Sequence, residues 1–501
     1  MRPSKHIRLV SIILGFALIM ALYTIGTHFG LNGITRRPLV AFITISCVLL
    51  LIGTTYVTWM SPKGLEQIQR RVYEFSKPSR EDNKPIPPMA ILVLVVAAIG
   101  FLALTSTYHA ILIEDTHGDP AAFLRFASET QQNGGVLQLL SELYSGQYIQ
   151  ANQHPFYISL LSLSPNLTFG KALSFSATVA TFLLITVYLI KVYHWRIAAI
   201  TATLLATNHA FSYFSGLATC EAWLTLFVTT TWISTDQALK SRTTKRAHIC
   251  WLAAGLLMGL AYLTKGTGLL FLCGVTLAAG TFGITHQLAT SPGQKTRAAL
   301  TAMAVVIGGW LITAHPLLVR NTVVYGSPTF NVNSYFLYMD EFPTEPEIQA
   351  TLSASDSLAE VRREFLKRHS ISDLIQREIK GIGWETFIFT RSLGPSPLGE
   401  SRVLAGVFIL LLMVLAVLHL ERSMQIFVLS LITASILVFA WYVPIAAGER
   451  FTAPILPLMM IYAGMGMHNI VSNQSGISTN SAMLACLCWT VIWSSYTVFA
   501  F

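Results

Sequence analysis

The chain has 501 residues, of which 53% are hydrophobic and only 11% are charged, and its mean hydropathy is +0.58. Its apolar runs are long enough to cross a bilayer as helices, which excludes a soluble globular protein. A formal net charge of +9 suggests nucleic-acid binding in a soluble protein, but here the basic residues cluster in short loops between apolar runs, as the positive-inside bias predicts. The composition therefore indicates an all-α, polytopic protein whose surroundings are membrane lipids.

The first apolar run follows Arg2, Lys5 and Arg8 and is not closed by the small-residue cleavage site of a signal peptide, so we expect a retained first helix. Apolar length and periodicity predict about thirteen transmembrane helices. Their expected ranges are 9–29, 39–60, 89–109, 170–190, 197–214, 219–238, 249–263, 267–286, 299–319, 403–419, 424–443, 453–470 and 482–501. We divide the chain into two extra helices with a basic loop (1–88), a transmembrane core (89–471), and a C-terminal loop with the last helix (472–501).

The distribution of basic residues predicts the orientation of these helices. With a cytoplasmic amino terminus, most lysines and arginines between spans fall in cytoplasmic loops, for example at 63–84, 240–246 and 295–297. The two long connections, 110–169 and 320–402, then lie on the outer, extracytoplasmic side.

Both long connections are expected to carry short amphipathic helices. In the first, Gly134-Gly135 separates a helix at 121–132 from a second one that begins near Val136. In the second, Ser357 to Glu360 and Ser370 to Asp373 have the spacing of helix starts with a capping box. Apolar residues then recur on one face of each helix, which predicts helices that lie on the membrane surface.

Charged side chains at span ends are costly beside hydrocarbon unless they are paired. Asp119 stands directly before Pro120, which is typical of a helix N-cap, and the same carboxylate can be held rigidly toward a cleft. Glu114, Asp115 and His117 precede it and suggest at most a loose metal site.

Three cations, Lys265, Arg320 and Arg450, also stand at outer span ends. The plain interpretation is a side chain that snorkels to the membrane surface. The functional one is a cation that binds phosphate, and three of them at one membrane face suit a single anionic head group. Glu221, at the start of a span, is expected to pair with one of these cations. His154 is either a loop histidine on the surface or part of the same site.

Five fragments in chain order resemble motifs of the GT-C superfamily of membrane glycosyltransferases. They are Asp119-Pro-Ala-Ala-Phe123 to Ala127, His154-Pro-Phe-Tyr157, Gly259-Leu-Ala-Tyr-Leu-Thr-Lys265-Gly-Thr-Gly268, Arg320-Asn-Thr-Val-Val-Tyr325-Gly-Ser-Pro328, and Glu449-Arg450-Phe451 with Pro454 and Pro457. The set covers about residues 89–471. It is most similar to the branch of bacterial enzymes that contains protein mannosyltransferases and aminoarabinose transferases, the glycosyltransferase family 39 type.

This resemblance implies a GT-C fold in a bacterial inner membrane, and inverting transfer of a sugar from a polyprenyl phosphate to an acceptor glycan, lipid or protein on the outer side. Because the basic residues are explained by topology, we expect no nucleic-acid partner. A phosphate bound by three cations needs no metal, so we expect no cofactor, although some members of the superfamily use a divalent metal. The residues with implied roles are Asp119 as general base, His154 as an orienting group, and Lys265, Arg320, Arg450, Glu221 and Tyr157 in the phosphate and substrate site.

Two features depart from the family pattern. The acidic residue that often follows the loop aspartate is Pro120 here, so Asp115 stays the alternative base, and two extra spans precede the core. A lipid-linked-sugar flippase or other transporter, and an oligosaccharide polymerase or ligase, also stay open. Transporters tend to place ionisable residues near the bilayer midplane, whereas nearly all the charge here lies at span ends or in the outer loops.

Overall fold

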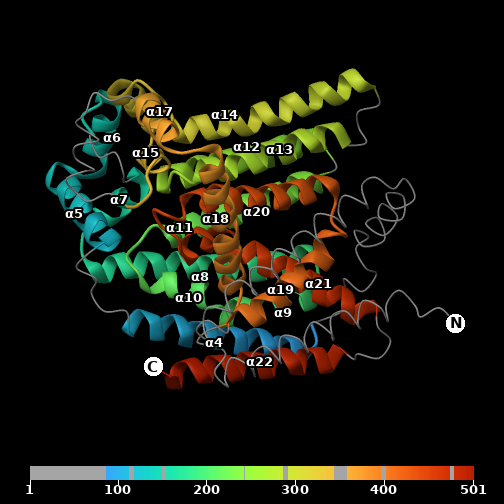
Figure 1. Cartoon of the computed structure of the whole chain (residues 1–501). Coiled ribbons are helices and arrows are strands. Elements are labelled where there is room, and N and C mark those ends of the chain that lie inside the picture. Colours follow the sequence, from blue (N-terminus) through green and yellow to red (C-terminus); the bar gives the residue numbers. More distant parts are fainter. Residues whose placement is uncertain are drawn as a thin grey trace.

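The computed structural model describes residues 86–111, 118–148, 154–241, 243–285, 291–342, 358–395, 402–473 and 479–500. The expected spans 9–29 and 39–60, and the alternative base Asp115, lie outside these ranges. Within them the regular elements are all helices (Figure 1). Six helical segments are long and apolar enough to cross a membrane, which supports an integral membrane protein: Pro88–Ile111, Leu167–Val192, Thr244–Thr264, Pro292–Tyr325, Arg422–Tyr442 and Ala453–Ser472.

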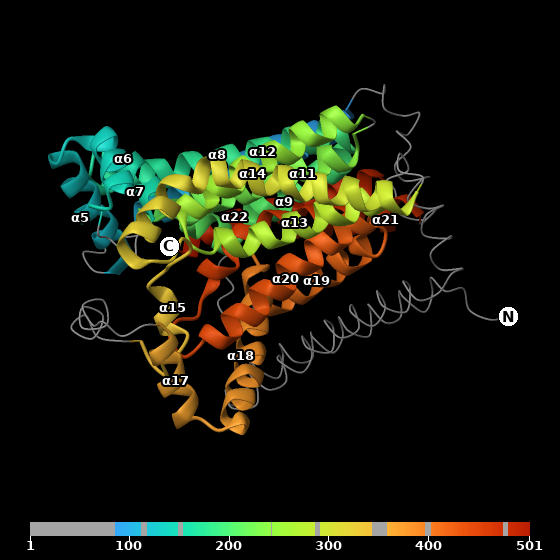
Figure 2. The same cartoon turned by 90° about the horizontal axis from the view of Figure 1, so that it is seen from above.

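The long helices run side by side as one bundle, seen from two directions in Figures 1 and 2. Every expected span from residue 89 onward overlaps one of them, while the total of about thirteen stays a prediction. The helices are α4 (Pro88–Ile111), α8 (Leu167–Val192), α9 (Trp195–Thr207), α11 (Glu221–Leu239), α12 (Thr244–Thr264), α13 (Gly268–Thr285), α14 (Pro292–Tyr325), α19 (Arg402–Val417), α20 (Arg422–Tyr442), α21 (Leu456–Asn473) and α22 (Thr479–Ala500).

Short helices from both long connections gather at one end of this bundle, which we call the loop end (Figures 1 and 2). They are α5 (Gly118–Gln132), α6 (Gly135–Ser145), α7 (Pro155–Leu161), α15 (Asn333–Phe336) and α17 (Leu358–Arg368). Helix α18 (Ile371–Ser392) runs across the direction of the bundle and packs on α19 and α20. Segments that are 200 residues apart in the chain are therefore neighbours at the loop end.

Helix α18 has the start and the apolar face that the sequence predicts. The side chains of Ser370 and Asp373 form a reciprocal capping box at its N-terminus. Ile371, Ile375 and Ile379 are 78%, 54% and 63% exposed and share one face. A row of exposed isoleucines beside membrane-spanning helices is what a helix lying on a lipid surface presents.

The expected span 197–214 is wrong as a single helix, because the chain breaks at Asn208. Helix α9 ends at Thr207, and the Asn208 side chain caps the short α10 (His209–Tyr213), which continues into a 3-10 turn, η1 (Phe214–Gly216). The amide of Asn208 also donates to the carbonyl of Ser392 at 2.8 Å. The side chain of Asn208 thus caps the start of α10 and joins it to the end of α18. For this reason the chain turns at Asn208 and does not continue as one helix.

Helices α12 and α14 pack closely through glycines. A β-carbon on Gly255 would overlap the carbonyl oxygen of Val306, and one on Gly309 would lie 2.6 Å from the carbonyl oxygen of Leu252. Small residues let membrane helices approach at the backbone level. This contact holds the ends of α12 and α14 near each other, and those ends carry Lys265 and Arg320.

Candidate active site

Asp119 and Arg450 form an ion pair across 331 positions of sequence. Helix α5 begins at Gly118, so Asp119 lies in its first turn and not at the expected N-cap. Its Oδ2 accepts a hydrogen bond of 2.8 Å from Nη1 of Arg450, which stands in the 3-10 turn η3 (Glu449–Phe451) before α21. The two side chains are 44% and 38% exposed, so both can be reached from solvent.

Glu221 and Lys265 form a second ion pair at the same end, which confirms the expected pairing of Glu221 with one of the cations. Glu221 is the first residue of α11, and Lys265 is the C-cap of α12. The Nζ of Lys265 lies 2.7 Å from Oε1 of Glu221. The glutamate side chain is only 3% exposed and the lysine side chain 21%, so this pair is more deeply buried than the pair of Asp119 and Arg450.

The two ion pairs lie together. The charged groups of Arg450 and Lys265 stand 5.1 and 5.8 Å from the ring centre of the same residue, Phe451. Burial lowers the pKa of Arg450, but Glu221 and Asp119 more than offset this and hold it above its ordinary value. We call Asp119, Glu221, Lys265 and Arg450 the four-charge cluster.

Arg320 and His154 form the neighbouring part of the site. Arg320 is buried near the end of α14, and its guanidinium lies 5.3 Å from the ring centre of Tyr148 and 5.4 Å from that of Tyr325. His154 is also buried, and its Nδ1 is 2.6 Å from the carbonyl oxygen of Tyr262. Because a carbonyl only accepts, Nδ1 carries the proton and Nε2 is left as an acceptor.

The surroundings of His154 keep its imidazole neutral near pH 7. Burial lowers its pKa to about 4, with Arg320 and Lys265 contributing in the same direction against the hydrogen bond to Tyr262. Asn331 Nδ2 stands 3.5 Å from Nε2. A β-carbon on Gly266, the residue after Lys265, would overlap Asn331 and lie 3.4 Å from His154 Nε2. His154 therefore lies close to the Lys265 turn and near Arg320.

Tyr157 is placed differently from the other candidates. It is fully buried, its hydroxyl donates to the carbonyl of Gly170 at 3.3 Å, and its ring meets that of Phe123 edge to face at 5.0 Å. Because Phe123 belongs to α5, Tyr157 supports the helix that carries Asp119. In this conformation it exposes no surface to a substrate.

A third group of charges surrounds Glu449, to which the sequence reasoning gave no separate role. The Glu449 carboxylate accepts from Nε of Arg391 at 2.8 Å and from Nη1 and Nη2 of Arg402 at 3.1 and 2.9 Å. This pairing holds the turn that presents Arg450. Of the residues that the sequence analysis did not name, Arg402 could have been found, because it stands at a span end as Lys265 does. No spacing in the sequence links Arg391 or Asn331 to the site.

Across the described ranges, no group of three or more histidine, cysteine or acidic side chains is placed to hold a metal ion. The expectations of no cofactor, and of a divalent metal in some members of the superfamily, both stay untested predictions. Among the described residues, the chemical groups of the site are carboxylates that can accept a proton, a neutral imidazole, and cations that can bind an anion.

The structure is an all-helical membrane bundle with a half-exposed carboxylate among cations at one end. Comparisons with known proteins indicate the class of protein to which such a bundle is similar. Residues 144–314 match the model of the family described as dolichyl-phosphate-mannose-protein mannosyltransferase. This match confirms the resemblance to GT-C membrane glycosyltransferases that the sequence motifs predicted. No curated protein matches the chain significantly.

Among solved structures, the chain is similar to the oligosaccharyltransferase AglB of Archaeoglobus fulgidus, in complex with an inhibitory peptide and a dolichol-phosphate, with 14% identity and a TM-score of 0.41. That match covers 82% of this chain and 56% of AglB, so the chain spans a little over half the length of that relative. It is also similar to ArnT of Cupriavidus metallidurans bound to undecaprenyl phosphate, with 13% identity, a TM-score of 0.31, and coverage of 80% and 87% of the two chains. Scores this low indicate a distant likeness only.

Proposed function

We propose that this protein is an inverting glycosyltransferase that moves a sugar from a polyprenyl phosphate to an acceptor at the extracytoplasmic face of a bacterial inner membrane. The single observation that carries the proposal is the four-charge cluster at the loop end. In this cluster Asp119, the proposed base, is paired with Arg450, and Lys265 is paired with Glu221, so a carboxylate and two cations from distant parts of the chain lie together.

Asp119 is the proposed base. One carboxylate oxygen, Oδ2, accepts from Arg450, and Oδ1 has no hydrogen bond within the described ranges. In the reaction, the acceptor hydroxyl oxygen forms a bond to the anomeric carbon while the bond from that carbon to the phosphate oxygen breaks. The phosphate leaves with the electron pair, and Oδ1 of Asp119 takes the hydroxyl proton. A positioned base of this kind accelerates such reactions by about 10² to 10⁴-fold.

Lys265, Arg450 and Arg320 are the proposed phosphate-binding cations. Each is held in place before any donor binds, Lys265 by Glu221, Arg450 by Asp119 and Arg320 by the surrounding tyrosines. Groups that are already oriented pay little reorganisation when charge develops on the leaving phosphate. Neutral His154, near Lys265 and Arg320, would accept a hydrogen bond at Nε2 from a hydroxyl of the sugar in place of the Asn331 amide, which stands 3.5 Å away.

The test is the release of undecaprenyl phosphate from undecaprenyl-phosphate-linked hexoses by the purified protein in liposomes, with an added glycan, lipid or peptide, or water itself, supplying the acceptor hydroxyl. Asp119→Asn keeps the size of the side chain and removes the base, so we expect turnover to fall by about 10² to 10⁴-fold while donor binding persists. Glu142→Gln changes a half-buried acid on α6 at the same end; it is the matched control and should leave turnover unchanged. A fully active Asp119→Asn protein would remove Asp119 from the role of base.

A further inference from the structure

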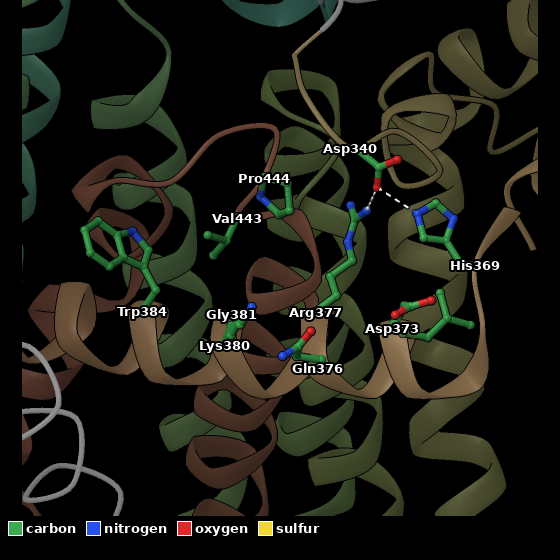
Figure 3. A pocket seen from close by; sticks show the side chains of 11 residues that line it. Asp340, His369, Asp373, Gln376, Arg377, Lys380, Gly381, Trp384, Val443 and Pro444 are labelled. Atoms are coloured by element: carbon green, nitrogen blue, oxygen red, sulfur yellow. Dashed lines mark hydrogen bonds and ion pairs between the residues drawn. The ribbon is translucent and has the colours of Figure 1, made fainter.

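A hollow lies at the loop end, along α18 and outside the four-charge cluster (Figure 3). Its volume is about 460 Å³, within the range of about 300–1,000 Å³ of pockets that hold small ligands. One face of α18 forms its floor, with walls from the α17–α18 turn, Asp340, and Val443 and Pro444 after α20.

This pocket faces away from the expected lipid surface. Lys380 lines it and lies nine positions, or about two and a half turns, after Ile371, which places the two on opposite sides of α18. Ile371 begins the exposed isoleucine row. With that row against lipid, the pocket opens toward the aqueous side of the membrane surface.

Arg377 is the buried polar group of the pocket. Its side chain is 9% exposed, its Nη1 lies 3.2 Å from Oδ1 of Asp340, and its Nε donates to the carbonyl of Trp441 at 3.1 Å. Its Nη2 is buried and has no hydrogen-bond partner. The Arg377 guanidinium also lies 4.9 and 5.4 Å from the ring centres of Trp441 and Phe365, so Arg377 fixes the wall of the pocket. The polar groups that a ligand can reach are the exposed side chains of Gln376 and Lys380.

The remaining groups select the chemistry of that ligand. The cations Arg377 and Lys380 are matched by the carboxylates of Asp340 and Asp373, so the pocket has no excess charge to hold an anion. The polar atoms include both donors and acceptors, as hydroxyl groups require. At one side stands the indole of Trp384 (Figure 3), whose flat apolar face suits the C–H face of a pyranose ring.

The pocket is also joined directly to the proposed catalytic turn. Pro444 in its wall is six residues before Arg450, which bonds Asp119, so the two places are at most about 20 Å apart along the chain.

From this arrangement we propose that the pocket beside α18 binds a neutral sugar residue of the acceptor, which makes the acceptor a glycan or glycolipid. The inference rests on the proposed function, because it names the second substrate of that reaction. The further units of such an acceptor would have to span the distance from the pocket to Asp119 for a free hydroxyl to reach the base.

The experiment is saturation-transfer NMR on the full-length protein in a detergent without a sugar head group. The probes are the methyl glycosides of glucose, galactose, mannose and N-acetylglucosamine, with a threonine-rich peptide as a separate sample. Gln376→Ala and Lys380→Ala remove exposed pocket groups without touching the core. Lys367→Ala on α17 is the matched control, since Lys367 is 64% exposed and lies outside the pocket. Binding of labelled undecaprenyl phosphate is measured on every sample.

We expect transfer to at least one glycoside, about tenfold weaker binding in each pocket variant, and no change in Lys367→Ala. The proposal is overturned if no glycoside receives signal, or if the pocket variants bind the glycosides as tightly as the parent protein does. It is also overturned if the pocket variants weaken binding of the peptide alone. Undecaprenyl-phosphate binding separates the two levels. If the parent protein binds undecaprenyl phosphate but one of these outcomes is found, the sugar pocket alone is rejected. If the parent protein does not bind undecaprenyl phosphate, the proposed function itself is rejected.

Discussion

At the scale of single residues, the charges of the candidate site are held in pairs. Glu221 and Lys265 are largely removed from solvent, so each needs the other to offset the cost of burial. Breaking such a pair by removing one partner is more costly than removing both, because a lone charge is left behind. The pairs also restrain the cations in the positions from which they would bind a phosphate.

Lys265→Met and Glu221→Gln test this coupling. We expect each single variant to lower the melting temperature of the protein in detergent more than the double variant does, because the double variant leaves no unpaired charge. Thermal unfolding followed by tryptophan fluorescence measures the effect. Simply additive losses would show that the two side chains do not act as a pair. Independently of stability, Lys265→Met should weaken undecaprenyl-phosphate binding.

His154 gives the site a pH dependence of known sign. Its pKa falls from 6.5 to about 4 on folding, mainly through burial, so between these values the unfolded chain binds more protons than the folded one. Its contribution therefore destabilises the fold as pH drops from about 6.5 toward 4, by up to about 3 kcal/mol.

His154→Asn removes this titration while keeping a donor for the carbonyl of Tyr262. The loss of melting temperature between pH 7 and pH 5 should become smaller in His154→Asn than in the parent protein. The matched control is His248→Asn, in the first part of α12 at the opposite end of the bundle, which should retain the full loss. An unchanged pH profile in His154→Asn would contradict a neutral, buried histidine.

At the scale of helices, the contact between α12 and α14 positions two of the proposed phosphate-binding cations. The short distance between α12 and α14 depends on glycine, since a β-carbon on Gly309 would clash with the backbone of α12. Gly308, the preceding residue, has no atom within 4 Å of the corresponding position.

These neighbouring glycines allow a matched test. Gly309→Ala should lower the melting temperature and weaken undecaprenyl-phosphate binding, because it pushes α12 and α14 apart. Gly308→Ala should be neutral or stabilising by roughly 0.5–1 kcal/mol, as alanine favours the helix over glycine. Thermal unfolding and donor binding of both variants measure the difference. Equal effects of the two substitutions would mean that the close contact does not position the cations.

At the scale of the whole molecule, the short helices α5, α6, α7, α15 and α17 of the two long connections lie at the loop end. The starts of α12 and α14, which carry Lys245, Arg246, Lys295 and Arg297, belong to the opposite end. From the positive-inside bias we therefore predict that the loop end, with the four-charge cluster, faces the extracytoplasmic side. A donor with a membrane-embedded prenyl chain would present its phosphate at that surface.

Cysteine labelling of intact cells tests this orientation. Leu137→Cys places a thiol on α6, where the native side chain is 82% exposed, and Gly293→Cys places one at the start of α14 at the opposite end. A membrane-impermeant maleimide should label Leu137→Cys in intact cells, but Gly293→Cys only after the membrane is opened. The reverse pattern would place the site in the cytoplasm.

Much of this protein could be predicted from local sequence. The apolar runs determine helices because lipid leaves the backbone no other partner than itself, and the capping box of Ser370 and Asp373 marks the start of α18 from four residues alone. Motif order also pointed to Asp119, Lys265, Arg320 and Arg450. The break at Asn208 was missed, because it depends on a bond to Ser392 in a helix far along the chain.

Only the tertiary structure decided which charge meets which. Sequence alone named three cations and one glutamate but not that Arg450 pairs with Asp119 and Lys265 with Glu221, nor that Arg391 and Arg402 brace Glu449. The sugar-sized hollow beside α18 likewise has no sequence signature, since its walls come from three separate segments. The physical reason is the range of the forces involved. Hydrophobicity and capping act between residues a few positions apart, whereas ion pairs and pockets form between side chains that only the packed bundle brings together.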